Sequence, residues 1–336
     1  MILNNKFYID KLQTVVFFGT SPDVKKLKEI NSSFGIKTIF IAGSDQSKNF
    51  EKNVKVNIFN NLNNKFKKLI NKNCKIKNTL FISIGARYIF KKNTIEKFLL
   101  NNLVNFHGTR LPLDAGGARI SWAVMREDRI NNQLVNLITE GIDTGPIVDN
   151  KSSLYPTSCR IPEDLRNYDN KKFLEFYKQF IEKIVKGKKF ELKHQADYLG
   201  RYNPRLNTKI NGLIDWNLNS YDLINFINTF EDPYNGASTY LNNGNHGRLF
   251  IKKCQLHGGE APNHPFMAGI VTRHDKDWIV VSTSGKHTLL VQEVLNQKGK
   301  NILSQIKPGD RFFTPAVELE KAKNKRIIYS SKGIKN

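Results

Sequence analysis

Short apolar runs and amphipathic segments alternate along the first half of the chain. Apolar or β-branched runs predict strands at residues 14–18, 37–42, 54–56, 79–84, 103–107 and 133–138, with extended chain again at 147–149. Between them, helical spacing and helix-start signals predict helices at 21–30, 59–70, 95–100, about 119–126 and 168–186. This alternation predicts an α/β fold: a Rossmann-like, mostly parallel sheet with helices on both faces.

The pattern changes after residue 190. A connector of mixed charge contains one predicted helix, at 221–230, and short strands separated by Gly and Asn follow from 237 to 313. Such strands are typical of a small C-terminal β-barrel-like domain. We therefore expect a first domain at 1–190, a connector at 191–235, a β-domain at 236–320 and a basic tail without fixed structure at 321–336.

Composition narrows the class of protein. The 336 residues are 39% hydrophobic, enough for a sizeable core, and no run approaches the ~20 apolar residues of a membrane helix. The first residues lack the apolar core of a signal peptide. The cysteines Cys74, Cys159 and Cys254 are scattered without metal-ligand spacing, which indicates free thiols in a reducing compartment. We expect a cytoplasmic protein without membrane insertion and without a bound metal.

The formal net charge of +23 leaves two interpretations open. Such an excess is typical of proteins that bind nucleic acid or another polyanion. The cationic residues are, however, spread through the whole sequence, as in a chain that is generally rich in Lys, Asn and Ile. A nucleotide-bearing substrate would be attracted by the same field.

Three polar side chains lie at the ends of predicted strands. Asn105 and His107 are two residues apart in the apolar run 103–107, so a strand places both on one face. Asp143 lies in a Gly- and Pro-bounded loop after the strand at 133–138. An amide that stabilises an oxyanion, an imidazole that moves a proton and a carboxylate that orients the ring suit acyl transfer. A single buried histidine is more often structural, but the two neighbours favour chemistry.

The same residues resemble a known family. Asn105-Phe106-His107-Gly108-Thr109, with Gly141-Ile142-Asp143-Thr144-Gly145 downstream, resembles the motifs of the folate-dependent formyltransferases. The resemblance covers most of the chain, since segments 81–90, 214–216, 233–237 and 268–271 are similar to the family's pteridine loop, interdomain segment and C-terminal β-domain.

The resemblance implies roles for individual residues. The formyl donor would be N10-formyltetrahydrofolate, a co-substrate. His107 would be the general base, Asn105 would hold the formyl oxygen, and Asp143 would orient His107. The pterin would be bound, largely through backbone groups, by two loops that contain Arg87, Tyr88 and Ile89, and Thr139, Glu140 and Gly141.

The chain departs from the family after His107. Thr109 replaces a serine, Arg110 stands where an apolar residue is common, and Ala115 replaces an arginine that contacts an anion. Arg110 or Arg119 would be a replacement cation, and Gly116-Gly117 ahead of a helix would offer backbone N–H groups to a phosphate or form a plain turn. The expected acceptor-binding residues are therefore Thr109, Arg110, Gly116, Gly117 and, as a stacking aromatic or an interdomain packing residue, Trp216.

The acceptor amine is inferred from the resemblance to sugar enzymes. Residues 41–47 pass to the third strand without the long Gly/Arg/Lys-rich insertion of methionyl-tRNA formyltransferases. We therefore expect a nucleotide-linked amino sugar, as in surface polysaccharide or lipopolysaccharide biosynthesis, and a possible homodimer. The alternatives are a methionyl-tRNA formyltransferase, a formyltetrahydrofolate hydrolase and a non-catalytic RNA-binding protein.

Overall fold

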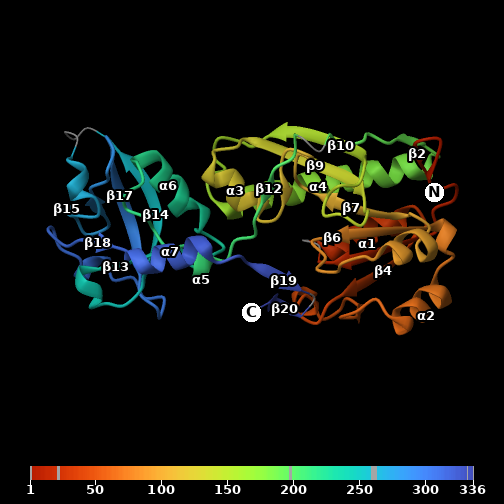
Figure 1. Ribbon diagram of the computed structural model, residues 1–336, viewed down its shortest axis with the longest axis horizontal. Helices are drawn as coiled ribbons and strands as arrows, with labels where there is room; N and C mark the ends of the chain where they lie inside the picture. The colour runs from red at the N-terminus through yellow and green to blue at the C-terminus, as the bar shows by residue number, and fades with distance from the viewer. Residues whose placement is uncertain (1, 21–22, 197–198, 259–262, 331, 336) are drawn as a thin grey trace.

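The first half of the chain forms a seven-stranded, mostly parallel sheet (Figure 1). The computed structural model describes residues 2–20, 23–196, 199–258, 263–330 and 332–335. The strand order is β10-β9-β7-β6-β3-β4-β5, in which β7 to β5 are parallel and β9 and β10 are antiparallel. The strands are β3 (Thr14–Gly19), β4 (Lys37–Ala42), β5 (Val56–Ile58), β6 (Thr79–Ile84), β7 (Leu103–His107), β9 (Ile130–Leu137) and β10 (Ile147–Leu154). The mostly parallel α/β prediction is confirmed.

Helices cover both faces of this sheet. On one face, α1 (Val24–Ser33) and α4 (Pro162–Val185) pack on the strands through one hydrophobic core. On the other face, α2 (Asn64–Asn73) and a π-helical turn, Thr94–Phe98, contribute to a second core. Every residue of β3 is buried, as expected for a central parallel strand between two helical layers. A further helix, α3 (Arg119–Met125), follows β7.

Several boundaries differ from the sequence prediction. α4 begins six residues before the predicted residue 168, because Pro162 occupies the first helical position and the Asp164 carboxylate accepts hydrogen bonds from the backbone of Arg160 and Ile161. A small sheet of β1 (Ile2–Leu3), β2 (Lys6–Phe7) and β11 (Phe190–Glu191) was not predicted, since two-residue strands carry no periodic signal. The predicted helix start at Ser21-Pro22 lies outside the described residues.

The second half forms a six-stranded antiparallel sheet covered by α6 (Ser220–Thr229). Its order is β15-β16-β17-β14-β13-β18. Its core includes Ile214, Trp216 and Phe230, which the sequence analysis places in the connector. The strands are β13 (Ala237–Leu241), β14 (Leu249–His257), β15 (Val271–His274), β16 (Ile279–Val281), β17 (Thr288–Leu295) and β18 (Phe312–Phe313).

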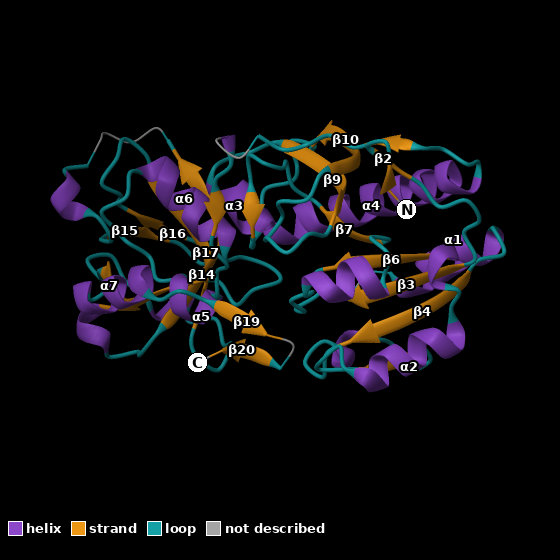
Figure 2. Ribbon diagram, turned by 45° about the vertical axis from the view of Figure 1, so that its right-hand side comes forward, coloured by secondary structure: helices purple, strands orange, loops and turns teal. Residues whose placement is uncertain are grey.

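The described C-terminal residues form regular elements, where the sequence predicted a tail without fixed structure. α7 (Ala316–Asn324) is followed by β19 (Ile328–Ser330) and β20 (Gly333–Lys335), which pair as a hairpin. The connector contributes β12 (Tyr202–Asn203), paired with β8 (Ala115–Gly116), and α5 (Thr208–Asn211). Figure 2 shows β19 and β20 between the two halves of the molecule. Residues far away in the sequence contact α7 and the segment that follows it, and the Lys-rich local composition of this segment gives no sign of such contacts.

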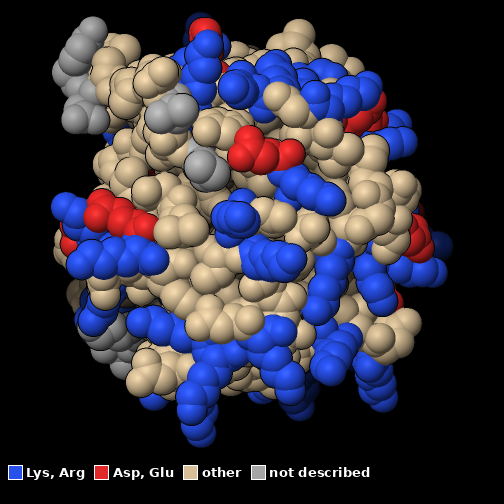
Figure 3. All heavy atoms as spheres, turned by 90° about the vertical axis from the view of Figure 1, so that its right-hand side faces the viewer, with Lys and Arg blue, Asp and Glu red and all other residues tan. Residues whose placement is uncertain are grey.

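Positive charge dominates the end of the molecule that carries α1 and α2 (Figure 3). Its exposed lysines include Lys25, Lys28, Lys65 and Lys68. This end lies at the amino ends of the parallel strands, whereas His107 lies at the carboxyl end of β7 (Figure 2). Much of the positive charge is therefore remote from the edge of the sheet where ligands bind in such folds.

Within the described ranges, no helix combines the length and apolar character required to cross a membrane.

Candidate active site

His107 and Asp143 meet at the carboxyl end of β7. The Nδ1 atom of His107 lies 3.5 Å from Oδ1 of Asp143, and both side chains are mostly buried. This distance is slightly longer than a hydrogen bond, and Nδ1 has no hydrogen-bond partner among the described residues. A small rotation of the imidazole would complete the contact and direct the other ring nitrogen at a reacting group.

The Asp143 loop is held in an uncommon conformation. Asp143 has a φ of 57°, in the left-handed region that non-glycine residues rarely adopt. The Gly116 N–H donates to Asp143 Oδ2 at 3.1 Å, and the Gln195 amide donates to the carbonyls of Asp143 and Gly145 at 2.8 and 2.6 Å. A Cβ on Gly145 would lie 1.8 Å from the Leu137 carbonyl, so only glycine fits there. These contacts fix the carboxylate beside His107.

The carboxyl group of Asp143 is held in its charged form. Burial raises its pKa, but the adjacent His107 ring, the Gly116 N–H and the charge of Arg205 outweigh burial and lower the pKa below the usual value. The ionised carboxylate can orient the imidazole and stabilise its protonated form. Asp143 therefore has the electrostatic properties of the orienting member of an acid–base pair.

A row of polar side chains crosses three strands beside His107. Strand register places Ser83 of β6 next to Asn105 of β7, and Asn105 opposite Asn136 of β9. All three line the same cleft as His107. The Asn105 amide makes no hydrogen bond to a described residue, and Asn136 Oδ1 is buried without a partner. Ser83 and Asn136 are not recognisable from the sequence, because strand register is needed to bring them to Asn105.

The cleft around these residues has a volume of about 380 Å³, within the usual range for a small-molecule site. Ile89 and Ile142 line it, although 90% and 71% of their surfaces are exposed. Two exposed isoleucines beside buried polar groups suit a flat ligand with an apolar face. The two loops expected to bind the pterin, with Arg87, Tyr88 and Ile89 and with Thr139, Glu140 and Gly141, both line this cleft.

The side chains of Arg87 and Tyr88 are engaged within the protein. Arg87 forms an ion pair with Asp45, and the Tyr88 hydroxyl donates to the Phe59 carbonyl at 2.7 Å. Burial raises the pKa of Tyr88, which remains a neutral phenol. The groups of this loop that can contact a ligand in the cleft are therefore its backbone and the Ile89 side chain.

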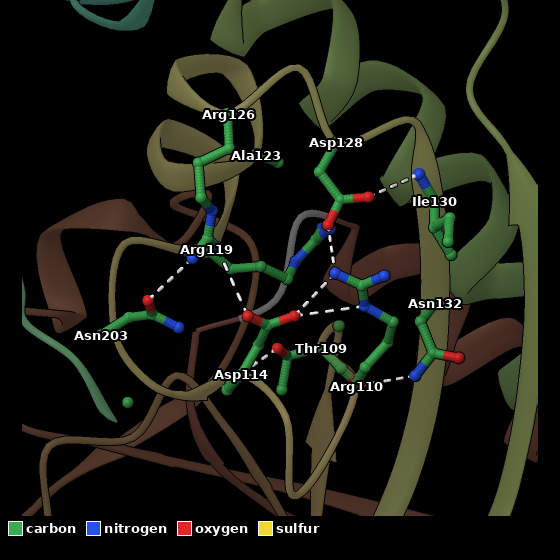
Figure 4. Close-up of a pocket in the computed structure, with 13 residues that line it drawn as sticks. Thr109, Arg110, Asp114, Arg119, Ala123, Arg126, Asp128, Ile130, Asn132 and Asn203 are labelled. Carbon is green, nitrogen blue, oxygen red and sulfur yellow. Dashed lines mark hydrogen bonds and ion pairs between the residues drawn. The ribbon is translucent and has the colours of Figure 1, made fainter. Parts of the chain in front are cut away.

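The arginine expected to bind the acceptor is committed to ion pairs, and that expectation was wrong. Arg110 pairs with Asp114 and Asp128, as Figure 4 shows. Arg126 and Arg201 also contact the Asp114 carboxylate, at 3.4 and 2.7 Å. The cavity among these side chains is about 20 Å³, room for about one water molecule. Arg110 and its neighbours therefore hold the loop between β7 and α3 together.

This network predicts a loss of stability when Asp114 is replaced. The Asp114 side chain is 6% exposed, so Asp114→Asn removes a buried carboxylate that three partly exposed arginines share, and it should lower the free energy of unfolding by about 2 kcal/mol at neutral pH. Burial raises the pKa of Asp114, but Arg201 and Arg110 hold it below its usual value. The carboxylate therefore stabilises the fold above the unfolded-state pKa, and this contribution is lost as pH falls through the folded-state pKa.

Urea unfolding of Asp114→Asn and the wild type at pH 7 and at acid pH measures both effects. Asp277→Asn is the control, because Asp277 is exposed in a turn. Equal stability of Asp114→Asn and the control at pH 7 would contradict a structural role for the network.

Three other expectations about the acceptor side also change. The Thr109 hydroxyl is buried and donates to the Asp114 carbonyl at 2.7 Å. Gly116 and Gly117 line the cleft, but their N–H groups donate to Asp143 and to the Asn203 carbonyl, so neither is left for a phosphate. Trp216 is buried in the C-terminal core, where it stacks on Phe312 and donates to Thr239, so its packing interpretation is the correct one.

Arg119 is likewise engaged. It forms an ion pair with Asp169 and donates to the Tyr155 hydroxyl at 2.8 Å. The cations that face the cleft come instead from outside the first sheet: Arg205 of the connector and Arg326 after α7. Neither arginine is recognisable from the sequence as part of this site, since both lie far from Asn105 and His107 in the chain.

Metal ligands do not gather anywhere in the described part of the chain, where no group of three or more His, Cys, Asp or Glu side chains could hold an ion. Cys74, Cys159 and Cys254 are free thiols. The polar side chains of the cleft suit proton transfer, through His107 and Asp143, and oxyanion stabilisation, through Asn105.

Comparisons with known proteins agree with this geometry. A family model described as "Formyl transferase, C-terminal domain" matches residues 207–306. A methionyl-tRNA formyltransferase from Desulfotalea psychrophila is 29% identical over 193 residues, which are 57% of this chain. The chain spans 56% of that relative's length.

Solved structures share the fold. WlaRD, a sugar 3N-formyltransferase determined with dTDP and 5-N-formyltetrahydrofolate, has a TM-score of 0.59 and 17% identity, over 84% of this chain and 97% of its own. An N-formyltransferase from Helicobacter canadensis, in complex with folinic acid and dTDP-3-aminofucose, also has a TM-score of 0.59 and 17% identity, over 84% of this chain and 99% of its own. At this identity the likeness establishes the fold alone.

Proposed function

Since this chain belongs to the folate-dependent formyltransferase family, we propose that it transfers a formyl group from N10-formyltetrahydrofolate to the amino group of a nucleotide-linked amino sugar. The observation that carries the proposal is the meeting of Asn105, His107 and Asp143 in one cleft at the carboxyl end of β7. Acyl transfer to an amine needs an oxyanion donor and a proton acceptor, and this cleft supplies both.

The cleft suits the donor. Exposed Ile89 and Ile142 provide apolar contacts for a flat heterocycle, and the loops that carry them present backbone donors and acceptors. The solved relatives named above contain formylated folates, which is consistent with the same type of donor here. The folate would be a second substrate that donates the formyl group, and residues of this chain would carry out the proton transfers.

The residues would act as follows. The amine nitrogen forms a bond to the formyl carbon, and the bond between that carbon and N10 breaks. His107 accepts the proton that the amine loses and returns a proton to N10, so tetrahydrofolate leaves neutral at that nitrogen. Asn105 donates from its amide to the formyl oxygen as negative charge develops there. Asp143 orients the imidazole and stabilises it while it is protonated.

The acceptor assignment rests on two considerations. The two solved relatives carry dTDP or a dTDP-amino sugar, and they share the fold over 84% of this chain. The segment after β4 is short and lacks the long basic insertion expected for a tRNA acceptor stem. A sugar amine is a small nucleophile that fits a cleft of about 380 Å³. Homodimer formation, which the resemblance suggests, stays a prediction.

Methionyl-tRNA is the second candidate acceptor. Its support is the 29% identity to a methionyl-tRNA formyltransferase and the net charge of +23. The net charge is weak support for a tRNA acceptor, because the basic end in Figure 3 lies at the amino ends of the parallel strands and His107 lies at the carboxyl end of β7.

A substrate panel distinguishes the acceptors. Purified protein would be given N10-formyltetrahydrofolate with dTDP-, UDP- and GDP-linked amino sugars, with charged methionyl-tRNA, or with no acceptor. We expect tetrahydrofolate release to depend on one of the amino sugars and a formamide product to appear by mass spectrometry. Turnover with charged tRNA alone would replace the sugar assignment, and equal release without any acceptor would indicate a hydrolase.

A further inference from the structure

The chain returns to the catalytic cleft after the C-terminal sheet. α7 packs on α5, where the Asn211 amide donates to the Ala322 carbonyl at 3.0 Å. The backbone of Ile327 then forms an antiparallel bridge with Arg205 of the connector, and the Ile327 side chain is buried. We call residues 325–330 the C-terminal arm. Figures 1 and 2 show the arm, with β19, running from α7 to the first domain.

The arm forms part of the cleft wall. Arg326, Ile327 and Ile328 line the same cleft as His107 and Asp143. Residues far apart in the chain thus line one site, in which β7 and the loop after β9 supply the acid–base pair and the arm supplies a cation.

Arg205 and Tyr202 line the cleft together with the arm. A Cβ on Gly117 would lie 2.3 Å from Cγ of Arg205, so the arginine side chain crosses that glycine. A Cβ on Gly116 would lie 3.0 Å from the Tyr202 ring, which is 54% exposed. Burial raises the pKa of Asp143, and the Arg205 charge is among the influences that lower it, which places the guanidinium within electrostatic reach of the catalytic pair.

Two kinds of side chain line the cleft. Ile89 and Ile142 are exposed apolar groups, and the donor is proposed to bind against them. Tyr202, Arg205 and Arg326 add an exposed aromatic ring and two guanidinium groups. Arg326 forms no ion pair with any residue that the structure describes, whereas Arg110 and Arg119, the cations of the catalytic loop, are bound to aspartates.

We propose that Tyr202, Arg205 and Arg326 form the subsite for the nucleoside diphosphate group of the acceptor, with the base stacked on Tyr202 and the phosphates bound by the two arginines. Guanidinium groups bind phosphate oxygens through paired, charge-assisted hydrogen bonds. Aromatic rings stack on any base. The arrangement would place the sugar, which follows the diphosphate, toward His107. This inference rests on the proposed function and assigns its acceptor specificity to the connector and the arm.

Arg326→Ala tests the subsite. We expect the KM for the nucleotide-linked amino sugar to rise about tenfold, with kcat and the KM for the folate donor within about twofold of the wild type. Lys325→Ala is the matched control, because Lys325 is the adjacent cation but lines a different groove. Arg326→Lys should recover part of the lost affinity, since it restores charge without the paired geometry.

A binding measurement separates this inference from the proposed function. Calorimetry with dTDP, UDP and GDP alone requires no turnover, and we expect Arg326→Ala to bind the preferred diphosphate about tenfold more weakly than the wild type and Lys325→Ala do. Weakened diphosphate binding without turnover of any amino sugar would sink the proposed function and leave the subsite standing. Turnover of an amino sugar by Arg326→Ala with an unchanged KM for that sugar would overturn the subsite and leave the proposed function standing.

Other outcomes also overturn the subsite. An effect confined to the KM for the folate donor would mean that Arg326 contacts the glutamate carboxylates of the folate. A rise in KM for charged tRNA, without any weakening of diphosphate binding, would assign the arm to a nucleic acid. Failure of the wild type to bind all three diphosphates would also overturn it.

Discussion

Replacing His107 by asparagine is expected to lower kcat for formyl transfer by about 10⁴-fold. Asparagine has a similar size and hydrogen-bonding capacity but cannot accept the proton that the attacking amine must lose. His107 lies at the end of β7 with its side chain 20% exposed, so the change leaves the packed part of the strand intact. KM values for donor and acceptor should therefore change little, and tetrahydrofolate release under steady-state conditions measures the effect.

The matched control is His274→Asn. His274 is exposed on β15 in the C-terminal sheet, far in sequence and structure from the cleft. Thermal unfolding of both variants verifies that the fold survives. If His107→Asn retained more than about a tenth of the wild-type kcat, His107 would not be the proton-transfer group and the proposed mechanism would be wrong.

Asp143→Asn is expected to lower kcat by about 10³-fold with little loss of stability. Asparagine tolerates the left-handed conformation that Asp143 adopts at φ 57°, so the loop backbone is retained. The substitution removes the negative charge that faces His107 Nδ1 at 3.5 Å. An amide at this position no longer stabilises the protonated imidazole and can hold the ring in the wrong tautomer.

Two measurements sharpen the assignment of Asp143. The double variant His107→Asn/Asp143→Asn should be no slower than His107→Asn alone, because the carboxylate acts only through the imidazole. The wild-type pH–rate profile should show no titration of Asp143 near neutral pH, since burial raises its pKa but His107, Gly116 and Arg205 hold it below the usual carboxyl value. Additive losses in the double variant would show that Asp143 acts independently of His107.

Local sequence patterns predicted the architecture well where strands and helices were long. The buried runs of β3, β4 and β6 and the helical spacing in α4 were each recognisable, and together they predicted the parallel sheet. Elements without periodicity were missed. β1, β2 and β11 are two residues long, and their pairing depends on a strand about 180 residues away in the chain.

The acceptor side shows why isolated residues are harder to interpret than motifs. Arg110 was expected to bind an anion because it stands where an apolar residue is common in the family, close to Ala115, which replaces an anion-contacting arginine. The structure commits it to Asp114 and Asp128, and Arg201 reaches the same carboxylate from 87 residues away. Trp216 was expected to be either a stacking aromatic or a packing residue, and its ring is buried against Phe312 of β18. Whether a cation or an aromatic ring is available for a ligand depends on its folded partners.

The sequence by itself determined the fold class and singled out Asn105 and His107, because a strand's period of two places both side chains on one face. It also singled out Asp143 from its Gly- and Pro-bounded loop, and resemblance added the formyl group. Only the tertiary structure brought the Asp143 carboxylate to His107 through Gly116 and Gln195, and Arg326 to the same cleft. The physical reason is distance along the chain. Local patterns encode which face a side chain occupies, whereas strand register, loop closure and the return of the C-terminal arm decide which distant groups meet there.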